Sequence, residues 1–240
     1  MLSRENLEKF TNLKQTSAQN VVREYCQHLF LSYLYQNRNS EKLLFKGGTA
    51  LRIILKSPRF SEDLDFTGET ITHGEIEELF TNTLANIEKT GITVHVTEST
   101  KTTGGYLGIA TFEAYDMKIN VQIEVSLRKG KKFEKTRALI TSDYIPAYTL
   151  VHLGLDDIIQ GKLQALVNRR KPRDFYDYFF LLSGDYPETR TKENLKNVMK
   201  LLRQENTNFQ MELKKFLPAS HTMHLRNFKK ILEQKILTYL

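Results

Sequence analysis

Two segments decide the fold, Phe45-Lys46-Gly47-Gly48-Thr49-Ala50-Leu51-Arg52 and Arg59-Phe60-Ser61-Glu62-Asp63-Leu64-Asp65-Phe66. The first follows a short apolar run that reads as a strand and leads into a helical stretch, so its Gly-Gly pair lies between the two. Because glycine has no Cβ atom, the backbone there can approach a ligand closely, and Thr49 adds a hydroxyl group at the same turn. This arrangement favours a phosphate ligand, although Gly-Gly pairs also occur in ordinary turns.

The second segment carries two acidic residues on one side of a predicted strand. Asp63 and Asp65 share one face, whereas Leu64 and Phe66 share the other. Two carboxylates at this spacing repel each other unless a cation lies between them. Mg²⁺ is the expected ion, because it takes few carboxylates and completes its shell with water and triphosphate oxygens. The alternative is a strand edge with solvated acids, which the low strand propensity of Asp disfavours.

The two segments together resemble a known enzyme family. A Gly-Gly turn with a hydroxyl residue, followed by Asp-x-Asp on a strand, is similar to the signature of DNA polymerase β-type nucleotidyltransferases. The fuller pattern resembles the AbiEii/MenT-type toxin nucleotidyltransferases, in which Ser often stands where this chain has Thr49. This resemblance implies catalytic, metal-binding roles for Asp63 and Asp65. It implies nucleotide contacts for Lys46, Gly47, Gly48, Thr49, Arg59 and Ser61.

The resemblance also points to three residues further along the chain. Such sites generally use a third metal-binding carboxylate from a neighbouring strand, and Glu124 lies on the polar face of the alternating stretch from Lys118 to Leu127. A helical Lys followed by Arg-Asp-x-x-Asp is typical of the family and matches Lys162 and Asp174. The resemblance gives both a catalytic role, in which Lys162 offsets negative charge and Asp174 orients Lys162 or a metal-bound water.

The residues alone leave structural alternatives open for these three positions. Glu124 fits equally well as a solvent-facing residue on a half-exposed strand. Lys162 lies on the apolar stripe of its helix, where a lysine usually extends its ammonium group outward to water. Asp174 lies near a predicted helix start, where an acid interacts favourably with the helix dipole.

Periodicity predicts an α+β fold in two parts. Helices are expected before residue 38, strands and further helices follow, and beyond about Tyr148 the pattern indicates helices only. We therefore expect a mixed-sheet nucleotidyltransferase domain with flanking helices over residues 1–147. The resemblance implies that this domain has a polymerase β-like fold. An all-helical C-terminal domain is expected over residues 148–240.

Charge is concentrated towards the C-terminus. From Thr191 to Leu240, ten Lys and Arg stand against four Glu, which gives +6 of the formal net charge of +7. A basic segment on a near-neutral body predicts a polyanion partner such as RNA. The alternative is a solvated helical surface. The basic C-terminal helices include Lys214, Lys215, Lys229 and Lys230.

Composition narrows the cellular setting. The single cysteine, Cys26, excludes an intrachain disulfide. The apolar runs are far too short to span a bilayer, and the first residues have no secretory signal pattern. We therefore expect a cytoplasmic protein with no membrane partner.

The expected function follows from the resemblance. It implies a Mg²⁺-dependent enzyme that transfers nucleotides from an NTP to an RNA acceptor, the tRNA 3′ end, as the toxin of a toxin–antitoxin pair with a cognate antitoxin. Two alternatives remain open, namely transfer of a nucleoside monophosphate onto a protein hydroxyl and a non-catalytic RNA-binding module. The presence of every expected acid argues against the second alternative.

Overall fold

The computed structural model describes residues 2–128 and 132–240, apart from the side chains of Met223 and His224. It divides into two compact units: unit 1 comprises Met1–Lys56 and Phe60–Gly154, and unit 2 comprises Ser57–Arg59 and Leu155–Leu240. None of the helices described is both long enough and apolar enough to cross a membrane. The division by contacts follows Gly154, and the domain boundary expected after residue 147 stays a prediction.

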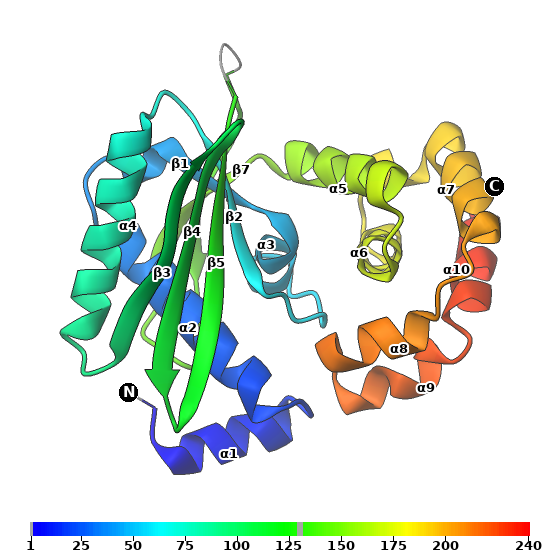
Figure 1. The fold of residues 1–240 in the computed structure, drawn as a ribbon. Helices are drawn as coiled ribbons and strands as arrows, with labels where there is room; N and C mark the ends of the chain where they lie inside the picture. The colour runs from blue at the N-terminus through cyan, green and yellow to red at the C-terminus, as the bar shows by residue number, and fades with distance from the viewer. Residues whose placement is uncertain (1, 129–131) are drawn as a thin grey trace. The chain divides into compact units, whose positions relative to one another are not determined.

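Unit 1 contains a seven-stranded mixed sheet with the strand order β3-β4-β5-β2-β1-β7-β6 (Figure 1). The strands are β1 (Leu43–Lys46), β2 (Asp63–Gly68), β3 (Thr93–Thr102), β4 (Gly105–Ala114), β5 (Met117–Leu127), β6 (Lys135–Ile140) and β7 (Tyr148–Leu153). The β1–β7 and β2–β5 pairs are parallel, and the other neighbours are antiparallel. The mixed sheet confirms the predicted α+β class. Strand β6 was not predicted, and the expectation of helices only beyond about Tyr148 is wrong for β7, which belongs to the sheet.

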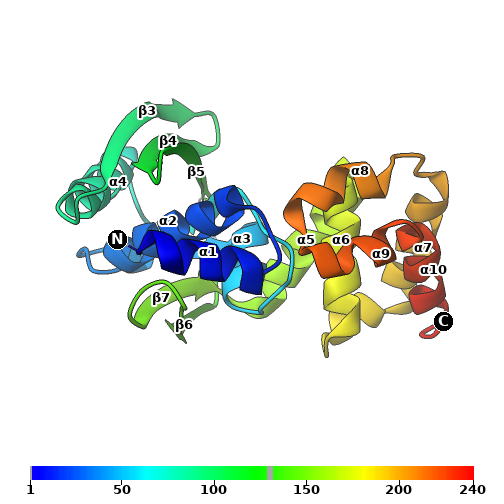
Figure 2. The ribbon, with the colours of Figure 1, turned by 90° about the horizontal axis from the view of Figure 1, so that it is seen from below.

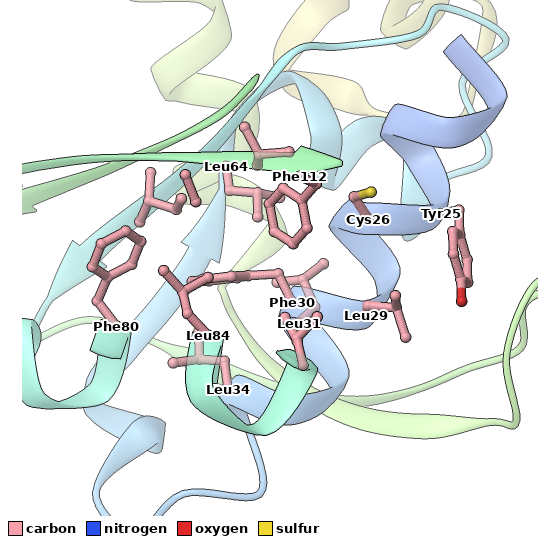
Figure 3. Packing of buried hydrophobic residues seen from close by; sticks show 14 of the residues in the cluster. Tyr25, Cys26, Leu29, Phe30, Leu31, Leu34, Leu64, Phe80, Leu84 and Phe112 are labelled. Atoms are coloured by element: carbon pink, nitrogen blue, oxygen red, sulfur yellow. The ribbon is translucent and has the colours of Figure 1, made fainter. Parts of the chain in front are cut away.

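The helices of unit 1 cover the apolar face of this sheet. They are α1 (Arg4–Leu13), α2 (Ala18–Leu34), α3 (Gly47–Ile53) and α4 (His73–Glu88). Figure 2 shows the sheet curving around α2, so that β3 and β6 lie at its two ends. In Figure 3, Phe30 of α2 and Leu84 of α4 pack in the same cluster as Leu64 and Phe112 of the sheet.

Alternation along β2 and β5 separates this core from a polar face. Leu64 and Phe66 are fully buried among the helices, whereas Asp63 and Asp65 are partly exposed. In β5, Ile119 to Val125 alternate between buried apolar and more exposed polar positions, as the sequence predicted. Because successive strand residues project to opposite faces, the acids of β2 lie on the face opposite α2 and α4.

Unit 2 consists of helices around an aromatic cluster. Its helices are α5 (Leu155–Arg169), α6 (Pro172–Ser183), α7 (Lys192–Gln204), α8 (Phe209–Leu213), α9 (Thr222–Leu225) and α10 (Phe228–Leu237). Phe175 of α6 packs edge-on against Phe209, and Tyr176 stacks on Phe228 with ring centroids 5.8 Å apart. The helices expected in this part of the chain are therefore present.

Candidate active site

The candidate active site lies on the polar face of the unit 1 sheet. Lys46 pairs with Asp65 between β1 and β2, and Asp65 pairs with Glu124 between β2 and β5. Paired residues on neighbouring strands project to the same face of a sheet. These three residues therefore form one row across three strands, which we call the charged row. Asp63 projects to the same face, opposite Gln122.

Gly47 brings the glycine turn into contact with the Asp65 side chain. Its φ is +86°, a left-handed conformation that favours glycine. A Cβ atom added to Gly47 would lie 1.9 Å from Oδ2, 2.7 Å from Cγ and 2.8 Å from Cβ of Asp65. The turn and the carboxylate fit together because residue 47 has no side chain.

Three hydrogen bonds fix the chain where it enters β2. The hydroxyl of Thr49 is buried and donates to the carbonyl oxygen of Asp63 over 2.5 Å. Gln27 of α2, which is 2% exposed, donates through Nε2 to the carbonyl oxygens of Ser61 (3.0 Å) and Glu62 (3.1 Å). These bonds restrain the backbone on both sides of residue 62 and so the direction in which Asp63 projects. Nucleotide contacts by Thr49 and Ser61 stay predictions.

A buried ion pair anchors α3, the helix that follows the glycine turn. Nε of Arg52 lies 2.6 Å from Oε1 of Glu24, and the hydroxyl of Tyr144 donates to Oε2 of Glu24 over 2.5 Å. Burial acts to raise the pKa of Glu24, but the charge of Arg52 and these hydrogen bonds outweigh it and lower the pKa. The guanidinium of Arg52 also lies 3.9 Å from the ring centroid of Phe60. Helix α2 therefore holds both the acid-bearing strand and the helix of the turn.

Lys46 extends from the end of β1 towards β5. Its Nζ donates to Oγ of Ser126 over 3.3 Å. Burial lowers the pKa of the Lys46 ammonium below its usual value. The carboxylates of Asp65 and Glu124 act to raise this pKa, whereas the charge of Arg128 lowers it further. The ammonium group is thus within electrostatic range of both acids of the charged row.

The three predicted metal ligands are brought together by the backbone but not by their side chains. Glu124 is exposed, and its Oε1 accepts a hydrogen bond of 2.5 Å from Gln122. Within residues 2–128 and 132–240, no group of three or more His, Cys, Asp and Glu is arranged to hold a metal ion. The role of Glu124 as a ligand beside Asp63 and Asp65 stays a prediction.

Unit 2 contains a buried ion-pair cluster built on Asp177. Nε and Nη2 of Arg59 donate to the two carboxylate oxygens over 2.7 and 3.0 Å, and Nζ of Lys162 donates to Oδ2 over 2.8 Å. Burial acts to raise the pKa of Asp177, but the charges of Arg59 and Lys162 and their hydrogen bonds outweigh it and lower the pKa to about 2. The Arg59 side chain is 4% exposed and has a structural role here, so its contact with nucleotide stays a prediction.

Asp174 has partners other than Lys162. Its Oδ1 accepts from Nη2 of Arg169 over 2.6 Å, and its Oδ2 accepts from the backbone N–H of Lys171 at the start of α6. The carboxylate that holds Lys162 is Asp177, the second acid of the Arg-Asp-x-x-Asp pattern. Within the described part of the chain, Asp174 makes no hydrogen bond or ion pair with Lys162, and the catalytic role of Asp174 stays a prediction.

The sequence of the chain matches a known protein family. A family model described as the nucleotidyl transferase AbiEii toxin of a type IV toxin–antitoxin system matches residues 29–237. The chain belongs to this family. The expected enzyme class, a nucleotidyltransferase, is therefore confirmed, and membership of a toxin–antitoxin family implies an antitoxin partner. No curated protein matches this AbiEii-family chain in sequence.

Two crystal structures from Helicobacter pylori share the fold of the AbiEii-family chain. The first is a protein with a provisional assignment as a nucleotidyltransferase; it is 18% identical, with a TM-score of 0.59 over 92% of this chain and 98% of that chain. The second is JHP933, also 18% identical, with a TM-score of 0.56 over 93% of this chain and 95% of that chain. At this identity the likeness shows the fold alone.

The lysines predicted to bind RNA differ in exposure. Lys214, Lys215 and Lys230 are exposed, whereas Lys229 is partly buried. Nζ of Lys229 donates to two backbone carbonyl oxygens at the C-terminal end of α7, over 3.3 and 2.7 Å. Lys229 therefore also stabilises the helical unit, and RNA binding by these AbiEii-family residues stays a prediction.

Sequence reasoning missed the supporting residues on α2. Helices were expected before residue 38, but the buried positions of Glu24 and Gln27, at 6% and 2% exposure, were not. The sequence offered one signal, since Glu24 and Gln27 lie among the apolar residues Val22, Tyr25 and Leu29 of a predicted helix. Buried polar groups require partners, but the sequence does not say which backbone they meet.

Proposed function

We propose that this AbiEii-family protein is a Mg²⁺-dependent enzyme that transfers nucleotides from an NTP to the 3′ end of a tRNA. One observation carries the proposal: Asp63 and Asp65 share a face, and the carboxylate of Asp65 fits against a glycine turn that has room for it only because residue 47 lacks a Cβ atom. Nucleotidyl transfer requires mainly the positioning of reactants and the neutralisation of charge. A rigid acidic pair beside a backbone turn is suited to both tasks.

The donor set fits Mg²⁺. Asp63 and Asp65 would hold the ion, with Glu124 as a further ligand from the neighbouring strand. Carboxylate oxygens suit a hard cation that takes the rest of its shell from water and triphosphate oxygens. When bound, the ion would neutralise negative charge on the triphosphate and favour formation of the attacking alkoxide.

The remaining roles belong to groups of the chain itself. In the proposed reaction the acceptor hydroxyl oxygen bonds to the α-phosphorus of the NTP while the bond to the β-phosphate breaks, and pyrophosphate leaves. The groups proposed to contact the nucleotide are Lys46, Gly47, Gly48, Thr49, Arg59 and Ser61. By resemblance, Lys162 offsets the developing negative charge, and Asp174 orients Lys162 or a water molecule. Asp177 holds the Lys162 ammonium group in place.

An RNA acceptor is supported by the charge distribution. The segment from Thr191 to Leu240 carries +6 of the net charge of +7, and exposed lysines such as Lys214, Lys215 and Lys230 lie within it. Phosphate contacts by lysine favour RNA without reading its sequence. We propose that unit 1, which contains the sheet, forms the polymerase β-like catalytic domain, that the helical unit 2 contacts tRNA, and that the protein acts in the cytoplasm.

Labelled NTPs offered with Mg²⁺ to tRNA and to total protein, in separate reactions, test the reaction and its acceptor. Asp63→Asn and Asp65→Asn are expected to lower transfer by at least a hundredfold, because a neutral amide is a far poorer ligand for Mg²⁺ than a carboxylate. The matched control is Asp116→Asn, which makes the same change at an exposed turn where only a surface ion pair with Arg4 is lost. This control should retain transfer.

Three results would contradict the proposal in different ways. Full transfer by both Asp63→Asn and Asp65→Asn would refute the proposed metal site. Label on protein and not on tRNA would overturn the RNA acceptor and favour transfer onto a protein hydroxyl. Absence of transfer to either acceptor, with tRNA binding retained, would indicate a non-catalytic RNA-binding module.

A further inference from the structure

The position of the Lys46 ammonium follows from its hydrogen bond to Ser126. Lys46 is on β1 and Ser126 is on β5, and β2 lies between these two strands. Neighbouring strands are about 4.8 Å apart, so β1 and β5 are separated by about 10 Å. A lysine side chain that bridges this gap places its ammonium group over β2. The group therefore lies on the face of the sheet from which Asp65 projects.

The Lys46 ammonium group lies in the region where a metal ion bound to the acids of the charged row would also lie. Asp65 is the residue of β2 that pairs with Lys46, and Glu124 is the residue of β5 that pairs with Asp65. Ser126 projects from β5 on the same face as Glu124, two residues further on. One positive charge of the chain thus lies next to the acids to which the proposed function assigns a divalent ion.

This arrangement affects free metal ions and metal–nucleotide complexes in opposite ways. A free divalent ion at Asp65 is repelled by the ammonium, and at a separation of about 6 Å this repulsion weakens binding about tenfold even at the dielectric constant of water. A divalent ion that arrives with a triphosphate belongs to a complex with net negative charge. The same ammonium attracts that complex and can bind its phosphate oxygens.

We propose that Lys46 makes the acidic site selective for the metal–triphosphate complex over the free divalent ion. This inference rests on the proposed function, because it assumes that Asp65 binds the metal. It adds that Lys46 acts as a counterion of the acids before substrate binds and as a phosphate ligand afterwards. The protein would then bind little metal without nucleotide.

Binding of Mn²⁺, followed through the electron paramagnetic resonance signal of the free ion, tests this without any turnover. Binding of Mn²⁺ alone is read from this signal. Triphosphate removes the free-ion signal by itself, so binding of the preformed Mn²⁺–triphosphate complex, which carries the phosphates of any NTP, is measured by isothermal titration calorimetry. Lys46→Met should bind Mn²⁺ alone about tenfold more tightly than wild type and the Mn²⁺–triphosphate complex about tenfold more weakly. Lys118→Met is the matched control, since Lys118 lies exposed on the same face of β5, six residues before Glu124.

Further variants separate this inference from the proposed function. Lys46→Arg keeps the charge and should keep the wild-type preference. Asp65→Asn combined with Lys46→Met should abolish the gained Mn²⁺ affinity. Unchanged Mn²⁺ affinity in Lys46→Met, or an equal gain in Lys46→Arg, would overturn the inference. If Asp65→Asn alone also leaves binding of the Mn²⁺–triphosphate complex unchanged, the metal site of the proposed function fails as well; if it abolishes that binding, the proposed site stands.

Discussion

Replacing Gly47 by alanine tests whether the close contact between the glycine turn and Asp65 holds the candidate active site in place. The added Cβ atom would lie 1.9 Å from Oδ2 of Asp65 and 2.8 Å from its Cβ. Rotation of the carboxylate can relieve the first contact but not the second, because Cβ moves only with the backbone. The substitution therefore displaces the turn, the acid or both by at least several tenths of an ångström.

A second glycine provides a control for the backbone strain. Gly91 has a φ of +85°, close to the +86° of Gly47, but a Cβ atom there would meet nothing within 4 Å. Alanine in a left-handed conformation costs about 1 kcal/mol at either position. Only at Gly47 does the new methyl group also displace a proposed metal ligand, and a shift of about 1 Å in a reacting group costs about a hundredfold in rate.

The assay measures kcat/KM for nucleotide transfer together with the free energy of unfolding for both variants. We expect Gly91→Ala to lose about 1 kcal/mol of stability and to keep its activity, whereas Gly47→Ala loses somewhat more stability and about tenfold to a hundredfold in kcat/KM. Wild-type kcat/KM in Gly47→Ala would refute the reasoning. Equal losses of activity in the two variants would refute it too, because strain alone would then explain the effect.

Two further predictions concern buried polar groups. Gln27→Leu removes both hydrogen bonds to the carbonyl oxygens before Asp63, so the concentration of Mg²⁺ that supports half-maximal transfer should rise severalfold. Gln27→Glu should show the same rise, because a carboxylate cannot donate these hydrogen bonds. An unchanged Mg²⁺ requirement in Gln27→Leu would contradict this. Asp177 has a folded-state pKa of about 2, below its usual value, so its stabilisation is complete above about pH 4 and is lost as pH falls through that pKa. Between pH 5 and pH 3 the wild type should lose about 1 kcal/mol more stability than Asp177→Asn in urea titrations, and equal losses would show that Asp177 is not the titrating group.

The sequence by itself determined the local features of the site. Alternation with a period of two placed Asp63 and Asp65 on one face of β2 and Gln122 and Glu124 on one face of β5. The Gly-Gly pair marked a turn between a strand and a helix, and the left-handed Gly47 occupies that turn. These features depend on residues within a few positions of one another, so periodicity and residue chemistry were sufficient to predict them.

Only the tertiary structure decided which of these local features meet. The parallel pairing of β2 with β5 places Glu124 beside Asp65, and the antiparallel pairing with β1 adds Lys46 to the same row. Gln27 reaches the entry to β2 from 34 positions upstream. Contacts of this kind depend on which strands pair and which helices pack together. Periodicity along the sequence does not specify these long-range partners.

The helical unit shows the same division. The sequence predicted that Lys162 and an acid of the Arg-Asp-x-x-Asp pattern lie on successive helices, as α5 and α6 do. Asp174 and Asp177 both fall in the first half of α6, three positions apart, and so lie close together on its surface. In the structure Asp177 accepts from Lys162 of α5, whereas Asp174 pairs with Arg169 and accepts from the backbone N–H of Lys171 at the start of α6. Spacing along one helix fixes which residues share a face, whereas the packing of two helices fixes which face is buried.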